Sequence, residues 1–311
     1  MKTKRKGDKS MKRETFITPT DGKEISIAVW DEVQNPKGVV QILHGMAEHI
    51  GRYDEFALAL NGIGFIVVGD DHRGHGLTDK DNLGKNVDGG DMFEKTVMDA
   101  IALTDTLKNR YGLPVVLFGH SYGSFLAQRY LNLSPTSLSG AVLCGSALMP
   151  NASVKLGAFV AKIKSRKKGD EKGKFFAKIT FAQYNKKFEG TPACWLNRNK
   201  WEVDAYRDDA LSGYTCSNAF YYSFFSGLKR VYKDKNALIP KTLPLLIMSG
   251  SQDAVGGKNA KNVKKLHTRY KKLGLNPTLK LYEGARHEIL KEINKAEVIC
   301  DTLKFIDQAI K

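Results

Sequence analysis

The sequence predicts an α/β protein with a mostly parallel central sheet, flanked by helices and interrupted by a helical lid insertion. Two observations lead to this fold class. Short apolar runs bounded by turn residues alternate with longer segments whose apolar residues recur at helical spacing. This alternation lapses after Ala147 and resumes near Leu243. Because strands that alternate with crossover helices pair in parallel and are buried on both faces, we expect one helix-covered sheet.

The expected strands and helices follow one another in a regular order. Two strands open the chain, and the later strands are separated by helices. The expected strands cover residues 14–17, 24–30, 38–43, 64–68, 114–118, 140–144, 244–248 and 278–282. The expected core helices cover residues 53–60, 92–108, 122–131, 259–273 and 296–310. With 311 residues, the chain is long enough to bury a core around one large sheet.

The chain is expected to divide into a tail, a core and a lid. Residues 1–13 carry seven Lys and Arg residues without a following apolar run, which predicts a basic disordered tail rather than a secretory signal. Residues 14–146 and 241–311 would form the core, and residues 147–240 the lid. The lid segment interleaves lysines with apolar and aromatic residues, which favours helices with an apolar underside.

Charge and cysteine content narrow the classes of function. The four cysteines are far apart and form no CxxC pair, so neither a disulfide scaffold nor a structural zinc site is indicated. The net charge of +16 favours contact with phosphates of nucleic acid or of anionic lipid. Because no helix-turn-helix, RNP-like or zinc-finger pattern accompanies the basic residues, we expect no nucleic-acid partner. We predict a cytoplasmic protein, with peripheral contact to an anionic membrane as a further hypothesis.

One serine lies in a motif typical of an exposed nucleophile. Residues 119–123 match the pattern G-x-S-x-G, with Ser121 at its centre. The motif stands between an expected strand and an expected helix, where a sharp turn projects the serine hydroxyl from the edge of a sheet. The pattern alone is a weak signal, so this context carries the prediction. We predict that Ser121 is the nucleophile, against the alternative of a purely structural turn serine.

A serine nucleophile needs an imidazole to accept its proton and a carboxylate to orient that imidazole. Asp253 lies in the loop after the strand expected at 244–248, at the edge where catalytic groups of parallel sheets collect. Of the seven histidines, only His267 and His287 come later. His267 falls inside an expected helix, whereas His287 lies just past a strand. We therefore predict Asp253 as the acid and His287 as the base, although loop residues of both types also serve as turn formers.

Acyl transfer also needs N–H donors for the oxyanion that develops on the carbonyl. Tyr122 directly follows the nucleophile and opens an expected helix. The loop at His44, Gly45 and Met46 follows the third expected strand and can turn the Met46 amide inward. We therefore predict the backbone N–H groups of Met46 and Tyr122 as the oxyanion hole.

Two pairs of histidines raise the question of a metal site. The pairs are His44 with His49 and His72 with His75. No neighbouring Cys or Glu completes a helical ligand motif such as H-E-x-x-H. We expect His44 to brace the oxyanion loop and His72 and His75 to brace the adjacent turn. No metal and no other cofactor is predicted.

Four short motifs together resemble one enzyme family. They are His44-Gly45-Met46-Ala47-Glu48-His49, Asp71-His72-Arg73-Gly74-His75-Gly76, Gly119-His120-Ser121-Tyr122-Gly123 and Gly284-Ala285-Arg286-His287-Glu288. Over residues 16–310, outside much of the lid, the chain is similar to the monoacylglycerol lipase and lysophospholipase branch of the α/β-hydrolases. The resemblance implies the α/β-hydrolase fold and the same roles for the predicted triad and the two amides. Tyr122 and Ser124 depart from the Met and Gly that are more frequent in the family.

The leading hypothesis is hydrolysis of a carboxylic ester through an acyl-enzyme on Ser121. The resemblance points to a monoacylglycerol or a lysophospholipid as substrate, and the lid aromatics, such as Phe159 and Phe181, are candidates for contacts with it. A peptidase, thioesterase or acyltransferase with the same triad is an alternative, as is a non-catalytic ligand receptor on the same fold. The serine excludes the aspartate-nucleophile chemistry of dehalogenases and epoxide hydrolases. The oligomeric state stays open.

Overall fold

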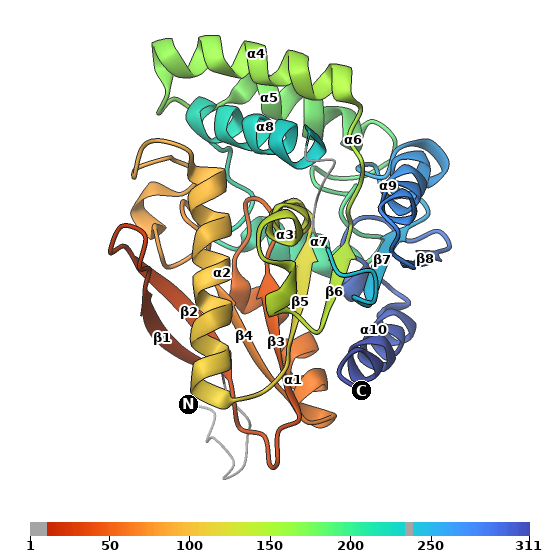
Figure 1. Ribbon diagram of the computed structural model, residues 1–311. Helices are drawn as coiled ribbons and strands as arrows, with labels where there is room; N and C mark the ends of the chain where they lie inside the picture. Colours follow the sequence, from red (N-terminus) through yellow and green to blue (C-terminus); the bar gives the residue numbers. More distant parts are fainter. Residues whose placement is uncertain (1–10, 234–238) are drawn as a thin grey trace, which may run out of the picture.

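A mostly parallel sheet organises the part of the protein that the computed structural model describes, residues 11–233 and 239–311 without the side chains of Phe181 and Ala182 (Figure 1). Its strands are β1 (Lys12–Ile17), β2 (Glu24–Trp30), β3 (Gly38–Leu43), β4 (Phe65–Asp70), β5 (Val115–His120), β6 (Gly140–Cys144), β7 (Leu245–Gly250) and β8 (Thr278–Tyr282). They lie side by side in the order β1-β2-β4-β3-β5-β6-β7-β8. β2 is antiparallel to β1 and β4, and all other neighbours are parallel. The predicted fold class is confirmed.

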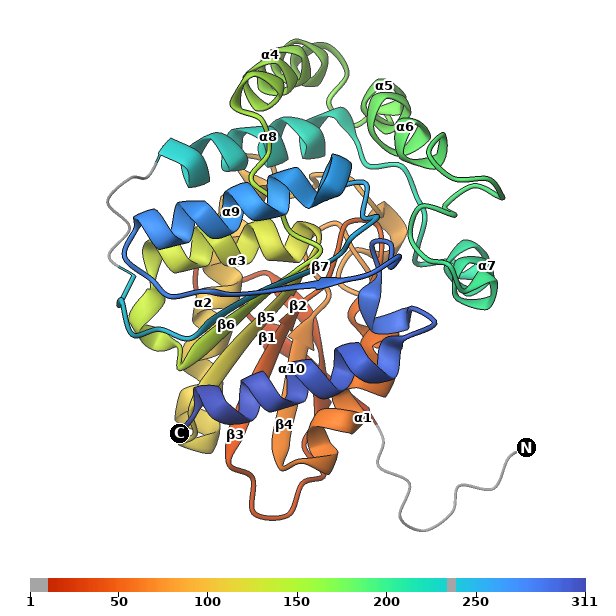
Figure 2. The same ribbon diagram turned by 90° about the vertical axis from the view of Figure 1, so that its right-hand side faces the viewer.

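Helices cover both faces of this sheet (Figures 1 and 2). The core helices are α1 (Asp54–Gly62), α2 (Met92–Tyr111), α3 (Tyr122–Leu133), α9 (Lys261–Lys272) and α10 (Lys295–Ala309). Apolar side chains of α2, α3 and α9 pack on one face, and those of α1 and α10 pack on the other. Every residue of β3, β4, β5, β6 and β7 is buried, as expected for strands between two helical layers.

The chain between β6 and β7 forms a further helical layer above the carboxyl ends of the strands (Figure 1). Its helices are α4 (Asn151–Lys168), α5 (Lys174–Ala177), α6 (Gln183–Asn185), α7 (Lys200–Asp208) and α8 (Asn218–Lys233), with a π-helical segment at Lys178–Ala182. α8 lies beneath α4 and packs on α2 and α3 of the core. This layer falls within the segment predicted as a lid, of which residues 234–238 lie outside the described part.

The sheet begins earlier than predicted. Residues 1–10 of the expected basic tail lie outside the described residues, but Lys12 and Arg13 belong to β1, where they pair with Val29 and Ala28 of β2. Arg13 also donates a hydrogen bond to Asp71 at 2.8 Å. The tail boundary at residue 13 is therefore corrected, because strand pairing and an acidic partner hold these two cationic residues in the sheet.

The helix predicted at 259–273 begins two residues later, as α9. Asn259 and Ala260 have φ values of 55° and 54°, in the left-handed region that a right-handed helix does not contain. The other predicted boundaries of the core helices and strands lie within three residues of those observed. Hydrophobic periodicity therefore located the elements, and local backbone geometry decided where each one starts and ends.

A buried ion cluster holds the loop after β4 against the start of the sheet. The fully buried side chain of Arg73 lies 2.6 Å from Asp99, 2.7 Å from Asp21 and 3.2 Å from Asp88. Thr18 donates a further hydrogen bond to Asp99 at 2.7 Å. Because Asp99 is itself only 3% exposed, removing the arginine would leave a buried carboxylate without its counter-charge.

We expect Arg73→Met to lower the free energy of unfolding by about 3–5 kcal/mol, because it leaves the carboxylate of Asp99 buried without its counter-charge. Urea unfolding followed by circular dichroism measures this change. Arg110→Met is the control, because Arg110 pairs with Glu14 at an exposed site and its loss should cost less than about 1 kcal/mol. Equal stabilities of the two variants would contradict the importance assigned to the cluster.

Candidate active site

Ser121 lies in the sharp turn between β5 and α3. Its φ of 52° and ψ of −116° mark a strained backbone for a residue other than glycine. A Cβ at Gly119 would lie 2.6 Å from the carbonyl oxygen of Gly123, and a Cβ at Gly123 would lie 2.1 Å from that of Leu43. Neither position of the motif can therefore carry a side chain, because neighbouring backbone atoms lie too close to each glycine. The resulting turn places Ser121 at the border of a cavity.

The predicted acid and base are hydrogen-bonded to each other. Asp253 follows β7 and His287 follows β8, and both are buried, at 2% and 1% exposure. Nδ1 of His287 lies 2.9 and 3.0 Å from the two carboxylate oxygens of Asp253. The N–H of Val255 and the hydroxyl of Ser249 donate to the same carboxylate, at 2.9 and 3.1 Å. This arrangement favours the tautomer of His287 that carries its proton on Nδ1.

The other ring nitrogen of His287 is available for chemistry. Nε2 is buried and has no hydrogen-bond partner among the described residues. His287 borders the same cavity as Ser121. Gly145 makes room for the ring, because a Cβ there would lie 3.0 Å from Cε1 of His287. A buried acceptor without a partner is uncommon in a folded protein, and the residue that carries this one borders the same cavity as Ser121.

Burial and charge act in opposite directions on this pair. Burial lowers the pKa of His287, but the carboxylate of Asp253 outweighs it and raises that pKa above its usual 6.5. Burial likewise raises the pKa of Asp253, and the charge of His287 lowers it overall. The neighbouring His120, whose ring centroid is 4.9 Å away, has its pKa lowered to about 4 by burial and by His287. Of these two imidazoles, His287 is therefore the stronger base.

The loop after β3 brings backbone N–H groups to the same cavity. A Cβ at Gly45 would lie 3.3 Å from Cβ of Ser121, so this loop passes directly beside the serine. Met46 and Tyr122 both border the cavity. Within the described residues, the N–H of neither one donates a hydrogen bond. Two residues whose N–H groups have no partner in the described part of the chain thus border the same cavity as Ser121.

Three buried histidines stand behind this loop. His44 and His72 stack with ring centroids 3.9 Å apart, and Nε2 of His44 accepts a hydrogen bond from the His72 N–H at 3.0 Å. Burial holds the pKa of His44 well below its usual value and that of His75 at about 3. The described residues contain no group of three or more His, Cys, Asp or Glu side chains that could hold a metal ion. The geometry shows His44 linking the loop after β3 to the turn after β4.

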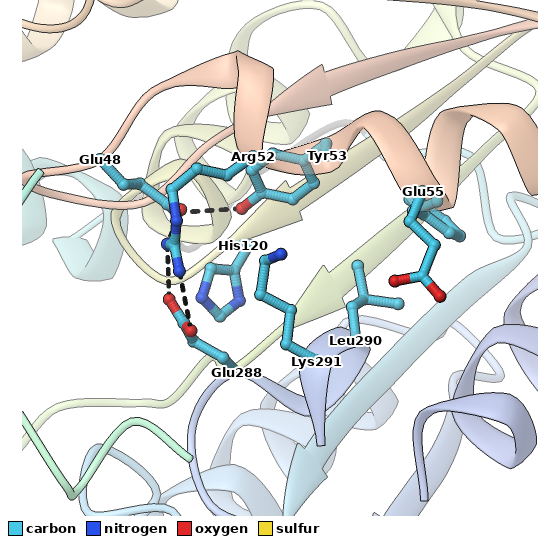
Figure 3. Close-up of a pocket in the computed structure, with 9 residues that line it drawn as sticks. Glu48, Arg52, Tyr53, Glu55, His120, Glu288, Leu290 and Lys291 are labelled. Carbon is cyan, nitrogen blue, oxygen red and sulfur yellow. Dashed lines mark hydrogen bonds and ion pairs between the residues drawn. The ribbon is translucent and has the colours of Figure 1, made fainter. Parts of the chain in front are cut away.

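A buried charge network joins the two loops that flank the serine (Figure 3). Arg52 donates to Glu48 at 2.5 Å and to both carboxylate oxygens of Glu288 at 2.6 and 3.0 Å. Glu48 in turn accepts a hydrogen bond from the Gly45 N–H at 2.5 Å. Because Glu288 is the residue after His287, Arg52 connects the predicted oxyanion loop to the loop of the base.

The cavity beside Ser121 has a volume of about 450 Å³ and is enclosed by both the core and the insertion. Aromatic and aliphatic side chains form much of its wall. They include Phe125, Met149, Tyr184, Trp195, Leu196, Tyr221, Phe224, Phe225, Leu228 and Val255. A cavity with an apolar wall and a few polar groups at one end is typical of a site for a small amphipathic ligand.

The structure corrects one predicted substrate contact. Phe159 is 64% exposed on α4 and does not border the cavity, because α4 packs on α8 through its other face. The side chain of Phe181, the second lid aromatic in that prediction, lies outside the described residues. Aromatic residues of α8, such as Tyr221 and Phe224, form the wall instead.

Sequence patterns missed how the insertion contacts the base. Trp195 packs on the imidazole of His287 with ring centroids 4.8 Å apart. Next to it, the Leu196 carbonyl accepts a hydrogen bond from the Glu288 N–H at 2.8 Å. The acidic residue after His287 was visible in its motif, but its partner Arg52 is far away in the chain. No local pattern marks Trp195, since its role depends on how the insertion folds back.

Comparisons with known proteins agree with this geometry. Residues 34–294 match the model of the family Hydrolase_4, described as serine aminopeptidase, S33. Human monoglyceride lipase is 30% identical over 282 residues, which cover 89% of this chain and 84% of that protein. The monoacylglycerol lipase of Mycolicibacterium smegmatis is 29% identical over 302 residues, covering 96% of this chain and 98% of the relative.

Solved structures share the whole architecture. A thermostable carboxyl esterase from Bacillus coagulans has a TM-score of 0.88 and 27% identity, covering 97% of this chain and 99% of its own. A monoacylglycerol lipase from Paleococcus ferrophilus has a TM-score of 0.67 at 24% identity, over 92% of this chain and 99% of its own, and supports the fold alone. The chain therefore belongs to the serine aminopeptidase S33 family of the α/β-hydrolases, in its monoacylglycerol lipase-like branch, and is a carboxylic ester hydrolase.

Proposed function

We propose that the protein hydrolyses the ester bond of a monoacylglycerol through an acyl-enzyme on Ser121. One observation carries this proposal: Nδ1 of His287 is held by the buried Asp253, while Nε2 has no partner among the described residues, and His287 borders the same cavity as Ser121. An imidazole in this state can take the proton of the serine hydroxyl and make its oxygen nucleophilic. The strained turn at Ser121 supports the same role, because strain of this kind is concentrated at functional sites.

In the first half of the reaction, Oγ of Ser121 attacks the ester carbonyl while its proton passes to Nε2 of His287. The carbonyl oxygen becomes an oxyanion, which the N–H groups of Met46 and Tyr122 stabilise. Asp253 stabilises the imidazolium that forms. The tetrahedral intermediate then expels the alcohol, which leaves with the proton from His287. The acyl group remains on the serine oxygen.

In the second half, water takes the place of the alcohol. His287 removes a proton from the water as its oxygen attacks the acyl carbon, and the same two N–H groups stabilise the second oxyanion. The bond between the acyl carbon and Oγ of Ser121 then breaks, and the serine recovers its proton from His287. The fatty acid leaves, and the enzyme returns to its starting state.

The cavity supports a lipid ester with a single acyl chain. Its apolar wall, which includes Phe125, Phe224 and Leu228, suits a hydrocarbon chain. The proteins named as monoacylglycerol lipases among the relatives support the same substrate. A lysophospholipid is the second candidate, favoured by Arg207 at the cavity border. Arg207 pairs with Asp204 at 3.3 Å, however, so its charge is partly satisfied, and a neutral glycerol head group is the better match.

The family description raises the alternative of an aminopeptidase. Such an enzyme needs an acidic group that binds the substrate's ammonium ion. Glu48 and Glu288 are the acidic residues that border the cavity within the described part of the chain. Both are engaged by Arg52, whose guanidinium lies within 2.6 Å of each carboxylate. Arg52 balances one of the two negative charges, and its N–H groups already occupy oxygens of both carboxylates. Neither carboxylate is therefore free to hold a peptide ammonium ion, and the site favours an ester with a neutral head group.

Peripheral contact with an anionic membrane is part of the proposal. The outer face of α4 exposes Leu156, Phe159 and Ile163 among lysines, a combination typical of helices that lie on a membrane surface. None of the helices in the described residues is long and apolar enough to span a bilayer. The cytoplasmic location predicted from sequence stays a prediction.

Ser121→Ala is expected to abolish labelling by a fluorophosphonate probe and to lower kcat by about a million-fold, because no other group can form the acyl-enzyme. Gel fluorescence and ester hydrolysis measure the two effects. Ser124→Ala is the matched control, since its hydroxyl donates to the Ser121 carbonyl from inside α3, and the variant should still be labelled. Labelling of the Ser121→Ala variant would refute the assignment.

The pH dependence of kcat/KM tests the base. His287 must be neutral to accept a proton, so activity should fall as pH drops through its raised pKa, above the usual 6.5. Asp253→Asn removes the carboxylate that raises this pKa, so the acidic limb of the profile should move to lower pH while kcat falls about ten-thousandfold. An acidic limb that does not move in this variant would show that the pair does not control the reaction.

A substrate panel tests the head group and the bond. We expect the purified protein to hydrolyse a monoacylglycerol with a higher kcat/KM than a lysophospholipid, an acyl-CoA or an aminoacyl amide, with the acyl chain held constant where the substrate has one. The reason is the match between the apolar wall, the neutral end of the site and a single-chain neutral ester. Fatty-acid or amine release measures each rate. Preference for the aminoacyl amide would establish the peptidase alternative in place of this one.

A further inference from the structure

Helix α9 and the turn before it form a strongly basic surface outside the active site. Between Asp253 and Glu283, the chain contains seven lysines and one arginine but no acidic residue. Six of these eight cations border one open groove with a volume of about 1020 Å³. They are Lys258, Lys261, Lys264, Lys265, Arg269 and Lys272. We call this surface the α9 groove.

The cations of the α9 groove lie on one side of the helix because they recur at intervals of three and four residues. The opposite side, with Val263, Leu266 and Tyr270, is buried against the sheet at β7 and β8. Figure 2 shows α9 running along the outside of the molecule, beneath α8. At 1.5 Å per residue, this helix of 12 residues is about 18 Å long, enough to reach several lipid head groups.

The lysines of the α9 groove are not neutralised by acidic residues within the part of the chain that the structure describes. The five lysines of the α9 groove are exposed, and none forms an ion pair with an acidic residue in the described part of the chain. Some exposed lysines elsewhere do have acidic partners, such as Lys168 with Glu171 at 2.9 Å. Like charges three or four residues apart repel and weaken a helix. An anionic partner would relieve that repulsion.

We propose that the α9 groove is a docking site for the anionic phospholipids of a membrane surface. Charge complementarity with phosphate-bearing head groups is the first argument. Position is the second: Leu148 borders the groove, and the next residue, Met149, borders the catalytic cavity. A bilayer held at the groove therefore lies beside the wall of the cavity that takes a lipid substrate.

Nucleic acid fits the same surface less well. Proteins that bind single strands combine cations with exposed aromatic rings on which bases stack. The aromatic ring of α9, Tyr270, is 3% exposed and belongs to the core. The surface therefore offers charge without stacking, which suits a layer of phosphate head groups.

This inference rests on the proposed membrane contact and assigns its electrostatic part to α9 instead of α4. The two helices are separable by experiment. Phe159→Ser on α4 removes an apolar contact and should weaken binding to neutral and anionic vesicles alike. Changes in the α9 groove should weaken binding to anionic vesicles alone, and increasingly so at low ionic strength, where charge contacts are strongest.

The test is co-sedimentation of the full chain with vesicles of phosphatidylcholine, with or without phosphatidylserine. The triple variant Lys261→Glu, Lys264→Glu and Lys265→Glu should bind the mixed vesicles more weakly by at least on the order of a hundredfold, since each lysine at an anionic surface contributes roughly fivefold. Hydrolysis of a short soluble ester should be unchanged, which shows that the variant is folded. Binding should persist in Ser121→Ala, so a failure of the hydrolase proposal is recognised separately.

A control variant with the same change in net charge separates the effect of lysine position from the effect of net charge on vesicle binding. The control is the triple variant Lys80→Glu, Lys108→Glu and Lys304→Glu, which reverses three exposed lysines outside the groove. It should lose only the few-fold affinity that the lower net charge explains. Equal losses in the two triple variants, or no loss in the α9 variant, would overturn the docking site. Tighter binding to a single-stranded RNA than to mixed vesicles would overturn the choice of lipid as partner.

Discussion

The candidate active site depends on the hydrogen bond between two buried groups, the Asp253 carboxylate and Nδ1 of His287. Both come from loops at the carboxyl ends of parallel strands, and both are almost fully shielded from water. In such surroundings their attraction is much stronger than it would be in solvent, so it outweighs the cost of burying the imidazolium. Trp195 of the insertion completes this shielding by packing on the imidazole. The insertion thus belongs to the site as much as the sheet does.

A second interaction fixes the position of the loop after β3 relative to the loop after β8. Arg52 binds Glu48, which holds the loop after β3, and Glu288, which follows His287. The loop that carries Met46 and the loop that carries His287 are therefore tied to each other. Burying three charges is costly, and in some proteins such networks favour one arrangement over others. Here the arrangement that they select is the spacing between the two loops around Ser121.

Much of the core followed from local pattern. Alternation of short apolar runs with helical periodicity predicted the strands, because a strand between two helical layers must be apolar throughout. The insertion was harder to predict, since its helices bury different faces according to what they pack on. Phe159 and Tyr221 belong to the same aromatic-rich segment, yet one is exposed and the other borders the cavity. Periodicity shows that a helix has an apolar face but not which partner covers it.

The sequence by itself determined which chemical groups the site contains and their order along the chain. Ser121, Asp253 and His287 each stand just after an expected strand, and a parallel sheet brings such positions to one edge. Only the tertiary structure decided which groups are paired and which are left free. The bridge from Arg52 to Glu288 and the packing of Trp195 on His287 both join segments far apart in the chain, and Nε2 of His287 has no partner among the described residues. Such contacts depend on distances in space, which no local run of residues encodes.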